Sequence, residues 1–177
     1  IDKADLIFCL DFNSASRTDG MAEKLSASKA KKILIDHHLN PDLETVLSVS
    51  RPEASSTCEL VFRLVWQLGE FDKLDRKFAI PVYCGMMTDT GGFTYNSTNP
   101  EIFYIISLLL TKKINKDKIY RNVYNNYSES RVRLMGHVLK DKLVVLKPYN
   151  ATYFSLTRED LKQFNYIKGD AEGLVNI

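Results

Sequence analysis

The sequence predicts an α/β fold in which a parallel sheet carries helices on both faces. The first observation is two short apolar runs without polar alternation, Ala4–Phe12 and Lys31–Asp36, as expected for fully buried strands. The second is that segments with helical spacing of apolar residues alternate with the predicted strands, which is typical of parallel sheets. Because such sheets bind ligands at the carboxyl ends of their strands, Asp11 and Asp36 fall where a site is expected.

The segments around these two strands complete the predicted sheet. Residues 13–30 combine a turn-forming cluster with helical spacing, since Met21 and Leu25 lie four residues apart. Glu44–Ser50 predicts a third, weaker strand, which Pro52 closes. This order supports a sheet whose strands are joined by crossovers.

Three helices are predicted after the third strand. Ser56 and Glu59 have the spacing of a capping box, in which each side chain satisfies a free amide at the helix start. Residues 75–89 predict a helix despite an internal proline, and a pair of glycines ends it. The third helix starts near Asn99, where Pro100 takes the first helical position that proline favours.

The character of the chain changes near residue 144. Residues 118–127 predict a tyrosine-rich helix, and residues 144–156 predict a hairpin around the turn "PYN". A short helix with Thr157 as its N-cap follows. We divide the chain into a main domain, residues 1–127, a linker helix, residues 128–143, and the beginning of a smaller α/β domain, residues 144–177.

The composition indicates a globular protein and argues against some classes of partner. Its 177 residues, 45% of them hydrophobic, suffice for one sizeable core. A net charge of +2 argues against electrostatic capture of long nucleic acid or of a membrane surface, but not against a small anion in a local pocket. The three cysteines lack CxxC spacing and fit reduced thiols, and no signal peptide or membrane-spanning run is visible. We therefore expect a cytoplasmic protein.

Acidic and imidazole side chains end three apolar segments, at Asp11, at Asp36-His37-His38 and at Asp89. Alone, an Asp after a strand is most often a helix cap or turn former, and a His pair is most often a surface group or a hydrogen-bonded core group. Together the three favour a metal site, because ionised carboxylates held there without a cation would be costly. Carboxylates and imidazole without thiolate suit Mn²⁺ or a related ion better than a structural zinc.

Several motifs resemble those of the DHH phosphoesterases. They are "FCLDFNSASR", "ILIDHH" and "GMMTDTGGFTYNST", and the ending "GDAEGLVNI" resembles the start of the DHH-associated C-terminal domain. Among subfamilies, the closest resemblance is to the bacterial nano-RNase/pAp phosphatase group, which is also called exopolyphosphatase-related. The resemblance covers most of the chain, and the motifs are specific as a set, whereas a "DHH" triplet alone would be weak.

The resemblance implies a role for each residue of the cluster. Asp11 resembles a carboxylate that bridges two metal ions, and His37 and Asp89 resemble ligands of one of them. His38 is similar to the histidine that contacts the substrate phosphate, and Asp36 resembles a residue that orients the imidazoles. Strand alternation, if it continues past Asp36, would place His37 on the opposite side from Asp36 and His38.

The activity that the resemblance implies is hydrolysis of short oligoribonucleotides and of 3'-phosphoadenosine 5'-phosphate (pAp). The mechanism would use water activated between two Mn²⁺ ions, with Mg²⁺ or Co²⁺ as alternatives. A cyclic dinucleotide phosphodiesterase, an exopolyphosphatase and a non-catalytic nucleotide-binding module stay open as alternatives. The expected partner is a short oligoribonucleotide or nucleotide substrate, with no long nucleic acid and no membrane, and a homodimer is left open.

Three further features have both a functional and a plain interpretation. Arg17 could reach a substrate phosphate through its bidentate guanidinium, although an isolated arginine is most often an ordinary surface charge. Gly91 and Gly92 either let backbone approach a ligand or simply end a helix. Residues 55–57, "SST", are assigned mainly to helix capping.

Two motifs of the family are missing from the 177 residues. They are the N-terminal "HxNPDGD"-like loop, which would complete both metal sites, and the C-terminal "GGGH" motif, which would hold the far end of the substrate. The chain also opens on Ile1 rather than Met and stops on Ile177 within an apolar pattern. We therefore expect an excerpt of an intact enzyme rather than a degenerate protein. Residues 1–177 alone are expected to hold at most one divalent ion and to be inactive.

Overall fold

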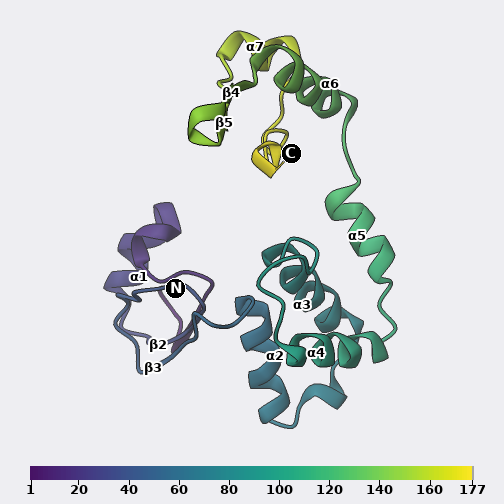
Figure 1. The fold of residues 1–177 in the computed structure, drawn as a ribbon. Coiled ribbons are helices and arrows are strands. Elements are labelled where there is room, and N and C mark those ends of the chain that lie inside the picture. Colours follow the sequence, from purple (N-terminus) through teal and green to yellow (C-terminus); the bar gives the residue numbers. More distant parts are fainter. Residues whose placement is uncertain (177) are drawn as a thin grey trace. The chain divides into compact units, whose positions relative to one another are not determined.

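The computed structural model describes residues 1–176, in which the chain forms two compact units (Figure 1). The first unit comprises residues 1–120, and the second begins at Arg121. The assignment of residues 1–127, 128–143 and 144–177 to named domains remains a prediction, and its last residue, Ile177, lies outside the described residues. In the described part of the chain, no helix combines the length and the apolar character that a bilayer crossing requires.

The elements of the first unit follow the order that the sequence predicts. In chain order they are β1 (Leu6–Leu10), the 3₁₀ segment η1 (Ala15–Met21), α1 (Ala22–Ala27), β2 (Lys31–Asp36), β3 (Leu47–Ser50), α2 (Thr57–Gln67), η2 (Phe71–Lys73), α3 (Arg76–Asp89), α4 (Pro100–Thr111) and α5 (Lys116–Tyr124), within which the boundary between the units falls. β2 has the predicted limits, whereas β1 and β3 are shorter than predicted.

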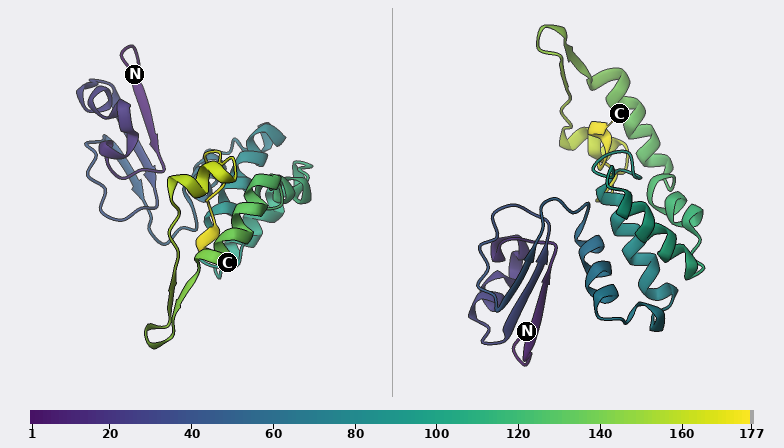
Figure 2. Two further views of the ribbon diagram at one scale, coloured as in Figure 1. Left: turned by 90° about the horizontal axis from the view of Figure 1, so that it is seen from above. Right: turned by 60° about the horizontal axis from the view of Figure 1, so that its bottom comes forward.

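The three strands form a parallel sheet in the order β1-β2-β3, which confirms the predicted α/β class. Leu10 at the end of β1 pairs with Ile35, and Asp36 at the end of β2 pairs with Ser50. The strands run side by side in Figure 2, where they are purple to blue. This register brings the carboxyl ends of β1 and β2 to one edge of the sheet.

Helices cover both faces of this sheet, as predicted. On one face, Cys9 and Leu34 pack with Leu25 of α1. On the other face, Ile35 packs with Leu60 of α2. All five side chains are at most 6% exposed, so each helix is fixed to the sheet by buried apolar contact.

The prediction that β1 is buried on both sides is wrong. Ile7 and Cys9 belong to the apolar cluster on the α1 face. On the opposite side, Leu6, Phe8 and Leu10 are 44%, 51% and 43% exposed. β1 is the edge strand of the described sheet, and the apolar cluster around α2 includes residues of β2 and β3 but none of β1. An apolar run therefore identified the strand but not how much of it is covered.

The start of α2 is capped, but not by the predicted reciprocal pair. Ser56 Oγ accepts a hydrogen bond from the amide of Glu59 at 3.1 Å. The Glu59 carboxylate instead accepts from both the amide and the hydroxyl of Ser55, at 2.8 and 2.7 Å. Its other oxygen accepts from Nε of Arg63 at 2.8 Å. Because Glu59 is only 3% exposed, these bonds hold the preceding loop firmly against the helix.

α3 and α4 begin where the sequence predicts, each behind a capping side chain, and α3 packs closely on α2. Asp75 and Asn99 each accept a hydrogen bond from the amide two residues later, at 2.7 and 3.0 Å. In α3, a Cβ atom at Gly85 would collide with Sγ of Cys58 in α2. The missing side chain at Gly85 therefore allows the close approach of the two helices near the end of α3.

The second unit contains the predicted hairpin and capped helix. Its elements are α6 (Glu129–His137), a π-helical turn η3 (Val138–Lys142), β4 (Val144–Leu146), η4 (Lys147–Tyr149), β5 (Ala151–Tyr153), α7 (Arg158–Gln163) and η5 (Leu174–Asn176). β4 and β5 pair in antiparallel fashion, and Thr157 forms a capping box with Asp160 at the start of α7. The long helix predicted over residues 128–143 is divided, because α6 passes into the π-helical turn.

The second unit packs around Leu134 and Val138, which are both 1% exposed. Next to this core, Nδ1 of His137 lies 2.8 Å from the Asp141 carboxylate, and Nε2 lies 3.1 Å from Asp160. Both ring nitrogens of this histidine are therefore engaged within the unit, and the ring joins α6 to α7.

Substitution of Gly85 tests the close contact between α2 and α3. The methyl group of Gly85→Ala would overpack this contact, so we expect the free energy of unfolding of the first unit to fall by about 1–3 kcal/mol. Urea denaturation followed by the fluorescence of Trp66, the single tryptophan of the sequence, measures this change.

A matched control is Gly136→Ala in α6, where a Cβ atom would meet nothing within 4 Å. There alanine should raise the free energy of unfolding by up to about 1 kcal/mol, because it favours the helix. Urea denaturation followed by far-UV circular dichroism measures this change, because the helical signal comes from both units. If Gly85→Ala is as well tolerated as Gly136→Ala, the separation of α2 and α3 is adjustable and our account of it is wrong.

Candidate metal centre

The candidate site lies where β1 and β2 end. Asp11 follows the last residue of β1, and its amide still donates to the carbonyl of Ile35 at 3.2 Å. Its φ of 66° is in the left-handed region, which a residue other than glycine seldom adopts. The backbone therefore turns sharply at Asp11 and directs the chain out of the sheet. Positive φ at such a position is common at functional sites.

Thr57 holds the side chain of Asp11. The Thr57 hydroxyl donates to Oδ1 of Asp11 at 2.9 Å, across 46 residues of sequence. Thr57 is buried in the first turn of α2, whereas the Asp11 side chain is 58% exposed. An exposed carboxylate is thus fixed by a buried donor.

His37 faces two carboxylates. Its Nδ1 lies 3.3 Å from the carbonyl oxygen of Ala54, and because a carbonyl only accepts, Nδ1 is the protonated nitrogen in this contact. Nε2 lies 3.7 Å from Oδ1 of Asp11 and 3.6 Å from Oδ2 of Asp89, the last residue of α3. The structure therefore brings together Asp11, His37 and Asp89 from three different elements.

Nε2 of His37 lies within 3.7 Å of one carboxylate oxygen from each of Asp11 and Asp89, an arrangement that a divalent ion would stabilise. When the ring is neutral and Nδ1 donates to Ala54, Nε2 presents a lone pair to these two oxygens. Lone pairs that face one another repel unless a cation lies among them. Two carboxylates and one imidazole are a donor set that suits Mn²⁺ and related ions.

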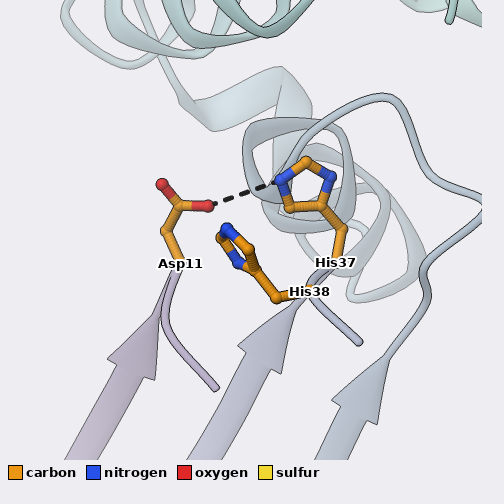
Figure 3. A group of neighbouring side chains, drawn as sticks. All are labelled: Asp11, His37 and His38. Atoms are coloured by element: carbon orange, nitrogen blue, oxygen red, sulfur yellow. Dashed lines mark ion pairs between the residues drawn. The ribbon is translucent and has the colours of Figure 1, made fainter. Parts of the chain in front are cut away.

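His38 belongs to the same cluster. Figure 3 shows Asp11, His37 and His38 together beyond the ends of β1 and β2. One ligand atom from each lies within 4.8 Å of the others, and the two imidazole rings are 5.0 Å apart between centroids. The condition for alternation to separate the two histidines is not met, because β2 ends at Asp36 and the backbone after it is no longer extended strand.

Asp36 orients one imidazole rather than both. Its Oδ1 lies 2.7 Å from Nδ1 of His38, and its side chain is fully buried. His37 is held instead by the Ala54 carbonyl. The second carboxylate oxygen of Asp36 has no hydrogen-bond partner among residues 1–176, so the buried carboxylate relies there on its single bond to His38.

The surroundings of the cluster disfavour negative charge. Burial, and then the nearby carboxylate of Asp11, raise the pKa of Asp89. Burial, followed by Asp89 and Asp11, raises the pKa of the Cys58 thiol to about 11. With no metal bound, Cys58 therefore stays protonated at neutral pH and is not a thiolate nucleophile.

Two weaker candidates lie outside the cluster. Arg17 is exposed in η1, and its guanidinium forms no hydrogen bond or ion pair with the described residues. Gly91 and Gly92 have φ of 55° and 73° where α3 ends, and a Cβ at Gly91 would collide with the ring of Tyr95. Packing of this turn is thus sufficient to explain the glycine at Gly91.

Sequence reasoning missed two contributors to the site. Thr57 was assigned to capping, but Ser56 forms the cap and Thr57 binds Asp11. The Ala54 carbonyl orients His37. No local signal marks either contact, since both partners are distant in sequence.

The chain resembles known proteins over most of its length. Residues 1–86 match the model of the DHH family, N-terminal domain. Over 171 residues the chain is 26% identical to the Bacillus subtilis protein named bifunctional oligoribonuclease and PAP phosphatase NrnA, covering 96% of this chain and 53% of that protein. It is also 28% identical over 156 residues to an uncharacterized protein of Mycoplasma pneumoniae, named as a homolog of MG371, covering 88% of this chain and 46% of that protein.

A solved structure has the same fold at higher identity. The crystal structure of an exopolyphosphatase-related protein from Bacteroides fragilis matches with a TM-score of 0.96 and 56% identity. The match covers 99% of this chain and 52% of that one. The chain therefore spans about half the length of the relatives that it matches.

Substitution of Asp89 tests the electrostatic cost of the metal-free cluster. Because its pKa is raised, ionised Asp89 opposes folding when no cation is bound. We expect Asp89→Asn to be more stable than the wild type at neutral pH in a chelator, by less than about 1 kcal/mol because the side chain is 38% exposed. Saturating Mn²⁺ should reverse this order, since a ligand at 100 times its Kd adds about 2.7 kcal/mol to the protein that binds it.

Urea denaturation in chelator and in Mn²⁺ measures both effects. Asp72→Asn is the control, because Asp72 is an exposed aspartate of η2 outside the cluster and should show neither effect. Lower stability of Asp89→Asn in the chelator would mean that contacts of Asp89 stabilise the fold, contrary to our account.

Proposed function

Residues 1–86 belong to the DHH family, and from this premise we propose that the protein is a metal-dependent phosphoesterase that hydrolyses short oligoribonucleotides and pAp. The observation that carries the proposal is the convergence of Nε2 of His37 with the carboxylates of Asp11 and Asp89, at 3.7 and 3.6 Å. This donor set suits a divalent cation, and phosphate esters are substrates that such cations activate.

Asp11, His37 and Asp89 would hold Mn²⁺ in this proposal, with Mg²⁺ or Co²⁺ as alternatives. The bound metal would supply Lewis-acid activation of water and neutralise charge on phosphoryl oxygens. The protein's own contribution is orientation: the Ala54 carbonyl fixes the ring of His37, and Thr57 fixes Asp11. Such partners of ligands raise affinity by holding each donor in place.

His38 would bind the substrate phosphate, with Asp36 as its support. The buried Asp36 carboxylate lies 2.7 Å from Nδ1 of His38 and so fixes the orientation of the ring. When Nε2 carries a proton, it can donate a hydrogen bond to a phosphate oxygen and pass that proton to the leaving oxygen. Arg17 stays a weaker proposal for phosphate binding, because nothing orients its side chain.

The substrate class in this proposal follows from the relatives and from charge. Two supports favour short nucleotides: the printed name of the Bacillus subtilis relative, and a net charge of +2 that is too small to retain long nucleic acid. The name of the Bacteroides fragilis protein favours polyphosphate as the second candidate. A cyclic dinucleotide phosphodiesterase, a non-catalytic nucleotide-binding module, a homodimer and a cytoplasmic location remain proposals of lower support.

A substrate panel on the intact gene product tests the proposal. We expect Mn²⁺-dependent release of nucleotides from an RNA dinucleotide and of phosphate from pAp, because both present an ester phosphate to the proposed metal. Cleavage of only a cyclic dinucleotide or only polyphosphate would overturn the substrate assignment. Binding of pAp without hydrolysis of any substrate would favour the non-catalytic module.

Substitution of Asp11 tests the location of the site. Removal of a partner of a metal ligand costs about 10–100-fold in activity, so loss of the ligand itself in Asp11→Ala should lower kcat/KM by more than about 100-fold. Asp72→Ala, at an exposed aspartate of η2, is the matched control and should retain wild-type kcat/KM. Equal losses in the two variants would mean that the site is elsewhere.

A further inference from the structure

The segment that leads into α2 holds two members of the cluster at once. The carbonyl of Ala54 accepts from His37 at 3.3 Å, and three residues later the hydroxyl of Thr57 donates to Asp11 at 2.9 Å. These bonds reach residues at the ends of two different strands. One short segment thus sets the relative position of an imidazole and a carboxylate.

Asp11 depends on the hydrogen bond from Thr57 for its orientation, because its side chain is more exposed than those of His37 and Asp36. Its side chain is 58% exposed, compared with 18% for His37 and none for Asp36. Packing therefore does not fix the rotamer of Asp11, and the hydroxyl of Thr57 is the hydrogen-bond donor that the described structure gives its carboxylate. Without that bond, the carboxylate would rotate into solvent.

Thr57 is well suited to this task because it is itself rigid. It is 5% exposed, and branching at Cβ restricts its χ1 angle. The turn that carries it is fixed by the cap of Ser56 and by the buried carboxylate of Glu59, which accepts two hydrogen bonds from Ser55. The donor therefore has little freedom to follow a moving acceptor.

Capping does not account for the Thr57 hydroxyl. The side-chain cap of α2 is Ser56, whose Oγ accepts from the amide of Glu59. The Thr57 hydroxyl instead donates a hydrogen bond to Oδ1 of Asp11, which lies 46 positions away in the sequence. A buried threonine whose hydroxyl serves a distant, exposed carboxylate indicates a role in that carboxylate's position.

We infer that Thr57 is a positioning residue of the metal centre, which fixes Oδ1 of Asp11 toward Nε2 of His37. This inference rests on the proposed function, because the position of Oδ1 matters only if a cation is shared with His37. The hydrogen bond occupies one lone pair of Oδ1 and leaves the carboxylate's other lone pairs for a cation. Thr57 touches neither substrate nor reacting atoms in this role.

The test compares Mn²⁺ affinity of three variants of the intact gene product by isothermal titration calorimetry. Thr57→Val keeps the shape but removes the donor, and its Kd for Mn²⁺ should rise about 10–100-fold. Thr57→Ser keeps the donor and should stay within about 3-fold of the wild type. Thr111→Val, which removes a hydroxyl bonded only to the carbonyl of Leu108 in α4, should leave the Kd unchanged.

The outcomes separate this inference from the proposed function. A wild type that binds no Mn²⁺ overturns the proposed function and removes the basis of the inference. A wild type that binds Mn²⁺, with Thr57→Val binding equally well, overturns the inference alone. Equal weakening in Thr57→Ser and Thr57→Val also overturns it, because the methyl group rather than the donor would then matter. If circular dichroism shows that Thr57→Val is misfolded, Thr57→Ala takes its place with the same expectation.

Discussion

The parallel pairing of β1 with β2 is the constraint on which the rest of the site depends. Leu10 pairs with Ile35, and the next amide, that of Asp11, donates to the Ile35 carbonyl before the chain turns away with φ of 66°. β2 ends one residue later, at Asp36, so the histidines that follow lie beside Asp11. An antiparallel pairing would have put the ends of these two strands at opposite edges, and no cluster could form.

The cluster is arranged at the expense of stability. Burial and Asp11 raise the pKa of Asp89, and one oxygen of the buried Asp36 carboxylate has no partner among the described residues. Groups placed in this way oppose folding unless a ligand compensates them. In proteins generally, carboxylates with such unfavourable surroundings are found most often at functional sites.

α2 joins the packing of the first unit to the geometry of the site. Leu60 of this helix is buried against Ile35 of the sheet, while the residues that precede and begin the helix hold Asp11 and His37. On its other side, α2 contacts α3 where Gly85 allows close approach, and α3 ends at the third carboxylate of the cluster. Asp11 and His37 therefore keep their positions because the same helix that covers the sheet also orients them.

The sequence by itself determined where the strands and most helices lie and which side chains make up the candidate site. Apolar runs, cap spacing and the residues Asp11, His37 and His38 are local signals, because they depend on hydrogen bonds and periodicity within a few positions. Only the tertiary structure decided that both histidines face Asp11, that Thr57 binds this carboxylate instead of capping its helix, and that one side of β1 stays uncovered. The physical reason is that these contacts join residues far apart in the chain, whose meeting depends on how α2 packs on the sheet and on where each strand ends.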